Sequence, residues 1–135
     1  MLKIAAQALG EMIEHCRREY PNEACGYLAG RRGEVARAYP IRNEAASPTW
    51  YEMDPSEQLK AQREIRRQGM EHLAVYHSHV ATEAYPSRRD IERATAVQDF
   101  FDGRYVLVTL KDPSPSARAF TIRDGHVSEE PLDEA

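Results

Sequence analysis

The residues of this chain that could do chemistry are concentrated between positions 77 and 90. A single residue separates His77 from His79, and a carboxylate, Asp90, follows eleven residues after the second histidine. On an extended strand alternate side chains share a face, so both imidazoles point one way and Ser78 points the other. Two histidines and one aspartate can bind zinc and leave its fourth position open, as catalytic rather than structural sites do. The pattern therefore predicts a catalytic metal site.

A simpler interpretation of these residues stays open from their spacing alone. A His-x-His pair at the end of a strand is often just polar surface. Ser87 and Asp90 are also spaced as a capping box at the start of a helix. The two interpretations are compatible, because a capped first helical turn would fix the direction of the Asp90 carboxylate.

A metal-activated water also needs a base that lies near the metal without binding it. Four glutamates are candidates: Glu23, Glu52, Glu57 and Glu83. Glu23 is unusual because it opens a short apolar segment, and a carboxylate at the edge of a core is unfavourable without a partner or a function. The alternative is that Glu23 is a solvated residue ahead of a strand.

These residues together resemble the signature of the JAMM metalloproteases, the catalytic branch of the MPN domains. That signature is a Glu, a later His-Ser/Thr-His, seven residues, a Ser, two residues and an Asp. Every spacing is kept by Glu23, His77, Ser78, His79, Ser87 and Asp90. The segment 21–30 and Pro86 also resemble the family, and the likeness extends over residues 5–123. Val80 is a departure, because the family often has proline there.

The resemblance implies a role for each of these residues. It implies that zinc is bound by His77, His79 and Asp90, that Glu23 is the general acid and base, and that Ser87 stabilises the oxyanion. The family hydrolyses amide or isopeptide bonds after the C-terminal glycine of ubiquitin-like proteins. Because the chain has no room for the insertions of eukaryotic deubiquitinating members, it is similar to short stand-alone prokaryotic members of the Mec type. The implied substrate is a MoaD- or ThiS-like sulfur carrier whose diglycine bears cysteine, a short extension or a conjugate.

Two other functions stay open at the level of sequence. In a cysteine hydrolase Cys25 would be the nucleophile and His77 or His79 the base, although thiols in apolar segments are usually inert. A non-catalytic scaffold or binding module of the MPN type would need no metal. A nucleobase deaminase is excluded, because the chain lacks its His-x-Glu and Pro-Cys-x-x-Cys motifs.

Composition limits the class of protein. The 135 residues fit one domain with its own core. Hydrophobic residues make up 41% of the chain and charged residues 30%, and this composition argues against disorder. With 18 basic and 22 acidic residues the net charge is −4, so a general nucleic-acid binder is not expected. The sequence contains no apolar run long enough for a membrane span and no signal-peptide pattern, so we expect a cytoplasmic protein. The oligomeric state, a homodimer included, stays open.

Hydrophobic periodicity predicts the elements that position these residues. Helices are expected over 5–19, 54–68 and 88–99, and strands over 23–30, 35–39, 51–53, 72–79, 105–110 and 117–123. The strand that carries the histidines should lie at the centre of a mixed, mostly antiparallel sheet in a three-layer α/β fold. The resemblance implies a single MPN domain, here 1–125, followed by an acidic tail, 126–135, that we expect to fray.

Two further segments carry open alternatives. The segment 43–54, with Trp50 and Tyr51 expected to be exposed, could pair with an extended substrate tail, or it could be a surface loop with locally packed aromatics. Cys16 and Cys25 can form at most one disulfide, which a reducing compartment disfavours.

Overall fold

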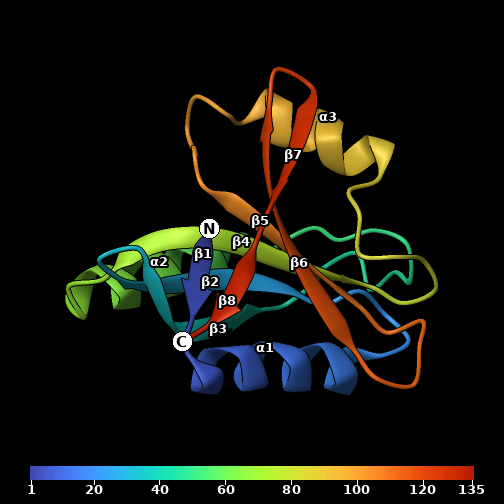
Figure 1. Ribbon diagram of the computed structural model, residues 1–135, viewed down its shortest axis with the longest axis horizontal. Coiled ribbons are helices and arrows are strands. Elements are labelled where there is room, and N and C mark those ends of the chain that lie inside the picture. Colours follow the sequence, from blue (N-terminus) through green and yellow to red (C-terminus); the bar gives the residue numbers. More distant parts are fainter.

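An eight-stranded sheet is the framework of the computed structural model, which describes residues 1–135 (Figure 1). The strands are β1 (Leu2–Ile4), β2 (Cys25–Arg31), β3 (Glu34–Ile41), β4 (Glu71–His79), β5 (Arg104–Thr109), β6 (Ser116–Arg123), β7 (His126–Glu130) and β8 (Leu132–Glu134). The helices are α1 (Ala6–Glu19), α2 (Pro55–Arg67) and α3 (Arg88–Ala96). None of them is long and apolar enough to span a bilayer.

The order of the strands is β7-β6-β5-β4-β2-β3-β1-β8. Four neighbouring pairs are antiparallel and three are parallel, so the prediction of a mixed, mostly antiparallel sheet is confirmed. β4 lies between β2 and β5, in the interior of the sheet, as its apolar sequence predicts. His77 is therefore paired on both sides, with Cys25 and Leu107, and His79 is paired on one side, with Thr109 of β5.

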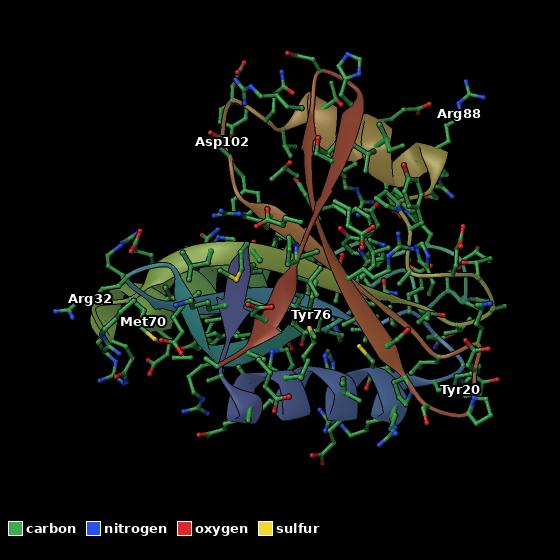
Figure 2. The ribbon with its side chains drawn as sticks, viewed as in Figure 1. Tyr20, Arg32, Met70, Tyr76, Arg88 and Asp102 are labelled. Atoms are coloured by element: carbon green, nitrogen blue, oxygen red, sulfur yellow. The ribbon has the colours of Figure 1, made fainter.

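The helices cover both faces of the sheet, which gives the three expected layers (Figure 1). On one face α1 packs Met12 and Cys16 against a core that includes Tyr76 of β4, and Figure 2 shows Tyr76 between the sheet and α1. On the other face α2 packs Ile65, and α3 packs Ala94. Because side chains alternate along β4, the residues next to Tyr76 point toward α2 and α3.

Polar caps determine where the two helices on that face begin. The Asp54 carboxylate accepts hydrogen bonds from the Ser56 and Glu57 backbone N–H groups at 2.9 and 3.3 Å, and Pro55 occupies the first turn of α2. At α3 the Ser87 hydroxyl accepts from the Asp90 N–H. Both starts agree with the sequence patterns that predicted them.

Two local predictions are wrong, and one strand was missed. α3 ends at Ala96 rather than at 99, because the N–H groups of Phe100 and Phe101 turn back to the Val97 carbonyl. The segment 51–53 makes only an isolated bridge between Asn43 and Met53 and is not a strand. Short strand β1 was not predicted from the sequence at all.

The loop 43–53 also differs from its predicted exposure. Tyr51 is buried, and Trp50 is half-buried. The guanidinium of Arg93 lies 3.8 Å from the Trp50 ring centroid and 4.3 Å from that of Tyr51. The aromatics of the loop are thus packed locally, which is the second of the two alternatives for this segment.

The expectation that residues 126–135 fray is wrong. The Asp124–Gly125 turn, with φ of 52° and 80°, returns the chain so that β7 pairs antiparallel with β6. After Pro131 the same extended chain continues as β8 and pairs with β1 at the opposite edge of the sheet. The acidic composition of the segment suggested a solvated tail. In the structure its carboxylates form ion pairs with basic side chains, as Glu129 does with Arg118 at 2.6 Å.

Candidate metal centre

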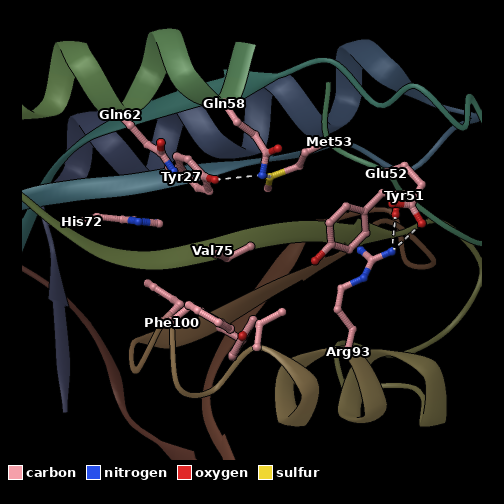
Figure 3. A pocket seen from close by; sticks show the side chains of 13 residues that line it. Tyr27, Tyr51, Glu52, Met53, Gln58, Gln62, His72, Val75, Arg93 and Phe100 are labelled. Carbon is pink, nitrogen blue, oxygen red and sulfur yellow. Dashed lines mark hydrogen bonds and ion pairs between the residues drawn. The ribbon is translucent and has the colours of Figure 1, made fainter. Parts of the chain in front are cut away.

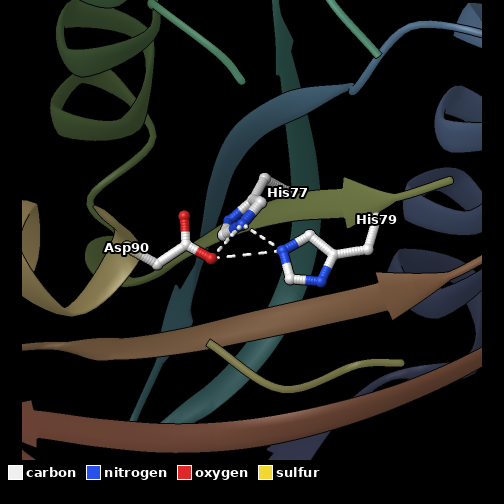
Figure 4. A group of neighbouring side chains, drawn as sticks. All are labelled: His77, His79 and Asp90. Carbon is white, nitrogen blue, oxygen red and sulfur yellow. Dashed lines mark hydrogen bonds and ion pairs between the residues drawn. The ribbon is translucent and has the colours of Figure 1, made fainter. Parts of the chain in front are cut away.

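His77, His79 and Asp90 converge at the end of β4, on the face covered by α2 and α3 (Figure 4). The Nε2 atoms of the two histidines are 3.3 Å apart. Asp90 Oδ2, from the first turn of α3, lies 3.2 Å from His77 Nε2 and 3.1 Å from His79 Nε2. All three side chains are buried. The alternation predicted for the strand is correct, because Ser78 points to the other face.

The spacing of these three atoms fits a tetrahedral metal ion. Ligand atoms about 2.0–2.1 Å from zinc, at tetrahedral angles, lie about 3.3–3.4 Å from one another. The observed separations of 3.1, 3.2 and 3.3 Å match three corners of such a tetrahedron. Two imidazole nitrogens and one carboxylate oxygen are also the donor types that zinc binds. The residues present therefore fit a zinc ion with one open position.

Neighbouring groups orient each of the three side chains. The Glu83 carbonyl lies 2.8 Å from His79 Nδ1, so this nitrogen carries the proton and donates it, which leaves Nε2 free to bind a metal. His77 Nδ1 has no hydrogen-bond partner, and its ring is held instead by the Tyr51 ring, 4.6 Å away between centroids. The Ser87 N–H donates to Asp90 Oδ2 at 2.9 Å, which completes the capping box.

The three groups also shift one another's pKa. Burial alone would raise the pKa of Asp90, but hydrogen bonds from both histidines outweigh it and hold the pKa well below its usual value. Burial lowers the pKa of His77, against the opposing effect of Asp90. Burial would also lower the pKa of His79, but Asp90 and the Glu83 carbonyl raise it overall. The carboxylate is therefore ionised and available to a cation.

Glu23 lies beside this group without belonging to it. The residue stands two positions ahead of β2, where Cys25 pairs with His77, and its side chain is only 5% exposed. Burial raises its pKa to about 7, while the charge of His79 lowers it and that of Asp90 raises it. A carboxyl group with this pKa can both accept and return a proton near neutral pH.

The other three glutamates do not compete for this position. Glu52 accepts from the Trp50 indole N–H at 2.8 Å and from Arg93 at 3.0 Å, and Glu57 accepts from the Arg42 N–H. Glu83 contacts the site only through its backbone carbonyl. Glu23 is the one buried carboxyl group among the four candidates.

Ser87 stands at the rim of the site. Its side chain is exposed, and its hydroxyl oxygen accepts from the Asp90 N–H at 3.1 Å. The hydroxyl proton is therefore free to be donated to a group that approaches from outside. The same residue is both the N-cap of α3 and a hydrogen-bond donor beside the metal ligands.

The geometry disfavours a cysteine nucleophile. Cys16 and Cys25 are both free and buried. The Cys25 thiol donates to the Ile41 carbonyl at 3.4 Å, and burial raises its pKa to about 12. A thiol in this state contains almost no thiolate at neutral pH, so the nucleophilic form is missing.

A cavity of about 360 Å³ lies next to the metal centre, between α2 and α3 (Figure 3). Its walls are mostly aromatic and apolar, and the polar residues between them are Glu52, Gln58, Gln62, His72 and Arg93. Tyr51 belongs to the cavity wall and also stacks on His77, so a single side chain separates the cavity from this ligand candidate. Arg93 holds the part of the cavity wall around Tyr51 in place, because it donates to the Tyr51 carbonyl at 2.7 Å and to the Glu52 carboxylate.

Three residues of this environment are not apparent from the sequence: Asn43, Tyr51 as a support for His77, and Arg93. Arg93 follows Asp90 by three residues on α3, so the helical period places both on one side of the helix. That spacing was the available signal for Arg93. Asn43 and Tyr51 act through the shape of a loop, which no periodic pattern encodes.

This fold and this cluster define a JAB/MPN-type domain with a His-His-Asp group that could bind a metal ion. The chain belongs to the family described as prokaryotic homologs of the JAB domain, whose model matches residues 5–123. The family resemblance noted from the sequence is confirmed.

Among curated proteins, the chain is 44% identical over 135 residues to the CysO-cysteine peptidase of Mycobacterium tuberculosis, with 98% of this chain and 90% of that protein covered. It is 44% identical over 95 residues to a probable TtuB-protein conjugate cleaving protease of Thermus thermophilus, with 70% and 64% covered. It is 37% identical over 127 residues to a desampylase of Haloferax volcanii, with 89% and 88% covered.

Solved structures agree with the fold. A solution structure of a protein from Desulfitobacterium hafniense matches with a TM-score of 0.86 and 38% identity, and covers 100% of this chain and 94% of that one. The crystal structure of a JAB1/MPN domain protein from Archaeoglobus fulgidus matches with a TM-score of 0.67 at 18% identity, over 99% and 97% of the chains. The predicted MPN fold is confirmed.

Proposed function

We propose that this protein is a zinc-dependent peptidase that cleaves the amide bond after the C-terminal diglycine of a ubiquitin-like sulfur-carrier protein. The bond would join the carrier to cysteine, to a short extension or to a conjugated protein. The observation that carries the proposal is the buried group of His77, His79 and Asp90, whose three ligand atoms are spaced as three corners of a tetrahedron. The peptidase and protease names of relatives 44% identical to this chain support the reaction class.

Zinc at this site would polarise the scissile carbonyl and make water a stronger nucleophile at neutral pH. Glu23 accepts the proton of the attacking water and later delivers it to the nitrogen of the leaving amine, for which a pKa of about 7 is suitable. Ser87 donates its free hydroxyl proton to the oxyanion that the carbonyl becomes. The amide and one water thus give a carboxylic acid and an amine.

The diglycine preference follows from access to a buried site. The ligand side chains are at most 9% exposed, so the substrate backbone has to approach closely, and glycine allows this without a clash at Cβ. The cavity between α2 and α3 shares Tyr51 with the surroundings of His77 and offers an apolar wall to the part of the carrier that precedes the diglycine.

The first test separates the metal ligands from the base. His79→Ala should lose both zinc and activity, because two remaining protein ligands seldom hold zinc. Glu23→Gln is nearly isosteric but cannot accept a proton, so it should keep one zinc per chain and lose about 10² to 10⁴ in rate. Elemental analysis of both purified variants decides: undiminished zinc in His79→Ala, or loss of zinc from Glu23→Gln, contradicts the assigned roles.

The second test concerns the substrate. Mass spectrometry would follow three substrates: a sulfur carrier extended after its diglycine, the same carrier with alanine as its last glycine, and an unrelated unstructured peptide. We expect cleavage of the first, a much lower rate on the second and none on the third. Equal rates on all three would indicate a general peptidase, and the substrate proposal would fail while the metal mechanism survived.

Two alternative functions are disfavoured by specific observations. A cysteine hydrolase would need a Cys25 thiolate, whereas burial raises the pKa of this thiol to about 12. Cys25→Ala should therefore stay active. A non-catalytic scaffold has no need for three buried ligand side chains, and it would contain no stoichiometric zinc when purified without chelator.

A further inference from the structure

Glu23 has to be positioned without the help of a strand ladder. β2 begins at Cys25, so the peptide units of Glu23 and Ala24 lie ahead of the paired part of the sheet. All four of their backbone polar groups are nevertheless paired. The Glu23 N–H donates to the Ser47 carbonyl at 2.9 Å, and the Ala24 N–H and carbonyl pair with Ser78 at 2.8 and 3.0 Å.

The remaining group, the Glu23 carbonyl, is paired by Asn43. Asn43 Nδ2 donates to it at 3.0 Å, and the two residues are far apart in the sequence. The same Nδ2 donates to the Trp50 carbonyl at 3.0 Å, while Asn43 Oδ1 accepts from the N–H groups of Ala45 and Glu52 at 3.0 and 2.9 Å. The amide of Asn43 therefore uses its full capacity of two donors and two acceptors.

This arrangement makes Asn43 a junction between the site and the loop 43–53. Three of its four bonds close the loop onto itself, and the fourth holds Glu23. The side chain is 8% exposed, so water does not replace these partners readily. The loop is in turn fixed to α3 by Arg93, which donates to the Tyr51 carbonyl, and Tyr51 packs on His77.

We propose that Asn43 is a positioning residue for Glu23: its side-chain amide couples the conformation of the loop 43–53 to the place of the carboxyl group beside the metal ligands. The proposal rests on the role given to Glu23 under the proposed function. Asn43 contacts no metal ligand, so its removal should displace the base and leave the metal in place. Small displacements of a reacting group are sufficient to slow a reaction about 10²-fold.

The coupling is tested first without any substrate. In Asn43→Ala all four bonds are lost. In Asn43→Asp the acceptors for Ala45 and Glu52 remain, but a carboxylate oxygen faces the Glu23 and Trp50 carbonyls. Asp54→Ala is the matched control, because it removes three hydrogen bonds at the end of the same loop, from the Ser56 and Glu57 N–H groups and the Arg42 guanidinium, and has no contact with Glu23.

Hydrogen-exchange mass spectrometry of the full chain gives the first result. We expect faster exchange in the segments 22–24 and 44–52 of both Asn43 variants than in Asp54→Ala. Unchanged exchange at 22–24 in both variants would mean that Asn43 does not hold Glu23, and would overturn the proposal whatever the enzyme's substrate is.

A double-mutant cycle on the zinc-loaded enzyme gives the second result. Asn43→Ala should lower kcat about 10- to 100-fold with zinc content unchanged, while Asp54→Ala keeps kcat within about twofold. Because Asn43 acts through Glu23, adding Asn43→Ala to Glu23→Gln should reduce the rate by less than about twofold further. If the double variant shows the product of the two single rate reductions, the positioning role is contradicted and the loop has a direct role in substrate binding.

The two arms separate this proposal from the proposed function. If the wild-type protein cleaves no carrier substrate, the proposed function fails, and the exchange result alone decides whether Asn43 holds Glu23. If the wild-type protein is active but Glu23→Gln is equally active, Glu23 is not the base, and Asn43 has no base to position.

Discussion

Single atoms at the metal centre serve two purposes at once. Asp90 Oδ2 accepts from the Ser87 N–H as part of the helix cap, and the same atom lies within 3.2 Å of both histidine Nε2 atoms. The cap therefore fixes the carboxylate in advance, which would reduce the conformational entropy lost on binding the proposed metal. The capping interpretation and the metal interpretation of Ser87 and Asp90, both left open by the sequence, are compatible in the structure.

A prediction at this scale separates the two roles of Ser87. Ser87→Gly removes the hydroxyl group, but glycine is tolerated at an N-cap and costs only a few tenths of a kcal/mol. We expect the free energy of unfolding to change by less than about 0.5 kcal/mol, while kcat falls about 10²- to 10³-fold because the oxyanion loses its donor. Urea unfolding and initial rates measured on the same preparation check both numbers. A rate within tenfold of the wild type would remove Ser87 from the mechanism.

At the scale of elements, the parts predicted correctly are those whose sequence pattern matches their environment. The helix at 5–19 has a regular apolar face, and β4 has an apolar run that agrees with its interior position. The spacing of His77 and His79 then fixes their common face. Each of these features is local, so the residues of a single segment are sufficient to predict it.

The elements that were missed depend on partners distant in the sequence. β1 and β8 are each three residues long. They pair with each other, and β1 also pairs with β3. No periodicity is measurable in three residues. The support of Glu23 by Asn43 is missed for the same reason, because it depends on how a loop returns across the sheet.

The last ten residues provide the prediction at this scale. Removal of residues 126–135 deletes β7 and β8, which exposes an edge of β6 and an edge of β1. We expect Tm to fall by about 5 °C or more, since a loss of 1 kcal/mol corresponds to several degrees in a domain of this size. Thermal unfolding followed by circular dichroism measures it. A truncated chain with the wild-type Tm would show that the tail is dispensable.

At the scale of the whole molecule, the two faces of the sheet differ in the ionisable groups that lie on them. The face toward α2 and α3 gathers charged and polar side chains into the metal centre. The opposite face, under α1, is mostly apolar, with the buried Ser78 and a buried polar pair in which His15 Nδ1 and the Tyr76 hydroxyl lie 2.7 Å apart. Burial and, to a smaller extent, the charge of Arg18 lower the pKa of His15 to about 4.

This buried histidine links the stability of the fold to pH. His15 stays neutral in the folded protein down to about pH 4, whereas in the unfolded chain it takes up a proton below about 6.5. Its contribution is therefore fully present above pH 6.5 and is lost as the pH falls toward 4. Burial acts in the opposite direction on Glu23, whose pKa is raised to about 7, so the folded state gains from protonation of Glu23 over part of the same range.

A comparison with a variant isolates the histidine, because the contribution of Glu23 cancels. His15→Gln keeps a polar group that can pair with the Tyr76 hydroxyl but does not titrate. Between pH 7 and pH 5 the free energy of unfolding of the wild type should fall by about 2 kcal/mol more than that of His15→Gln. Urea unfolding of both metal-free proteins at the two pH values gives the difference, and removal of the metal keeps its own pH-dependent binding out of the measurement. Parallel changes in the two proteins would mean that His15 is protonated equally in the folded and unfolded states, against the burial that α1 and the sheet impose on it.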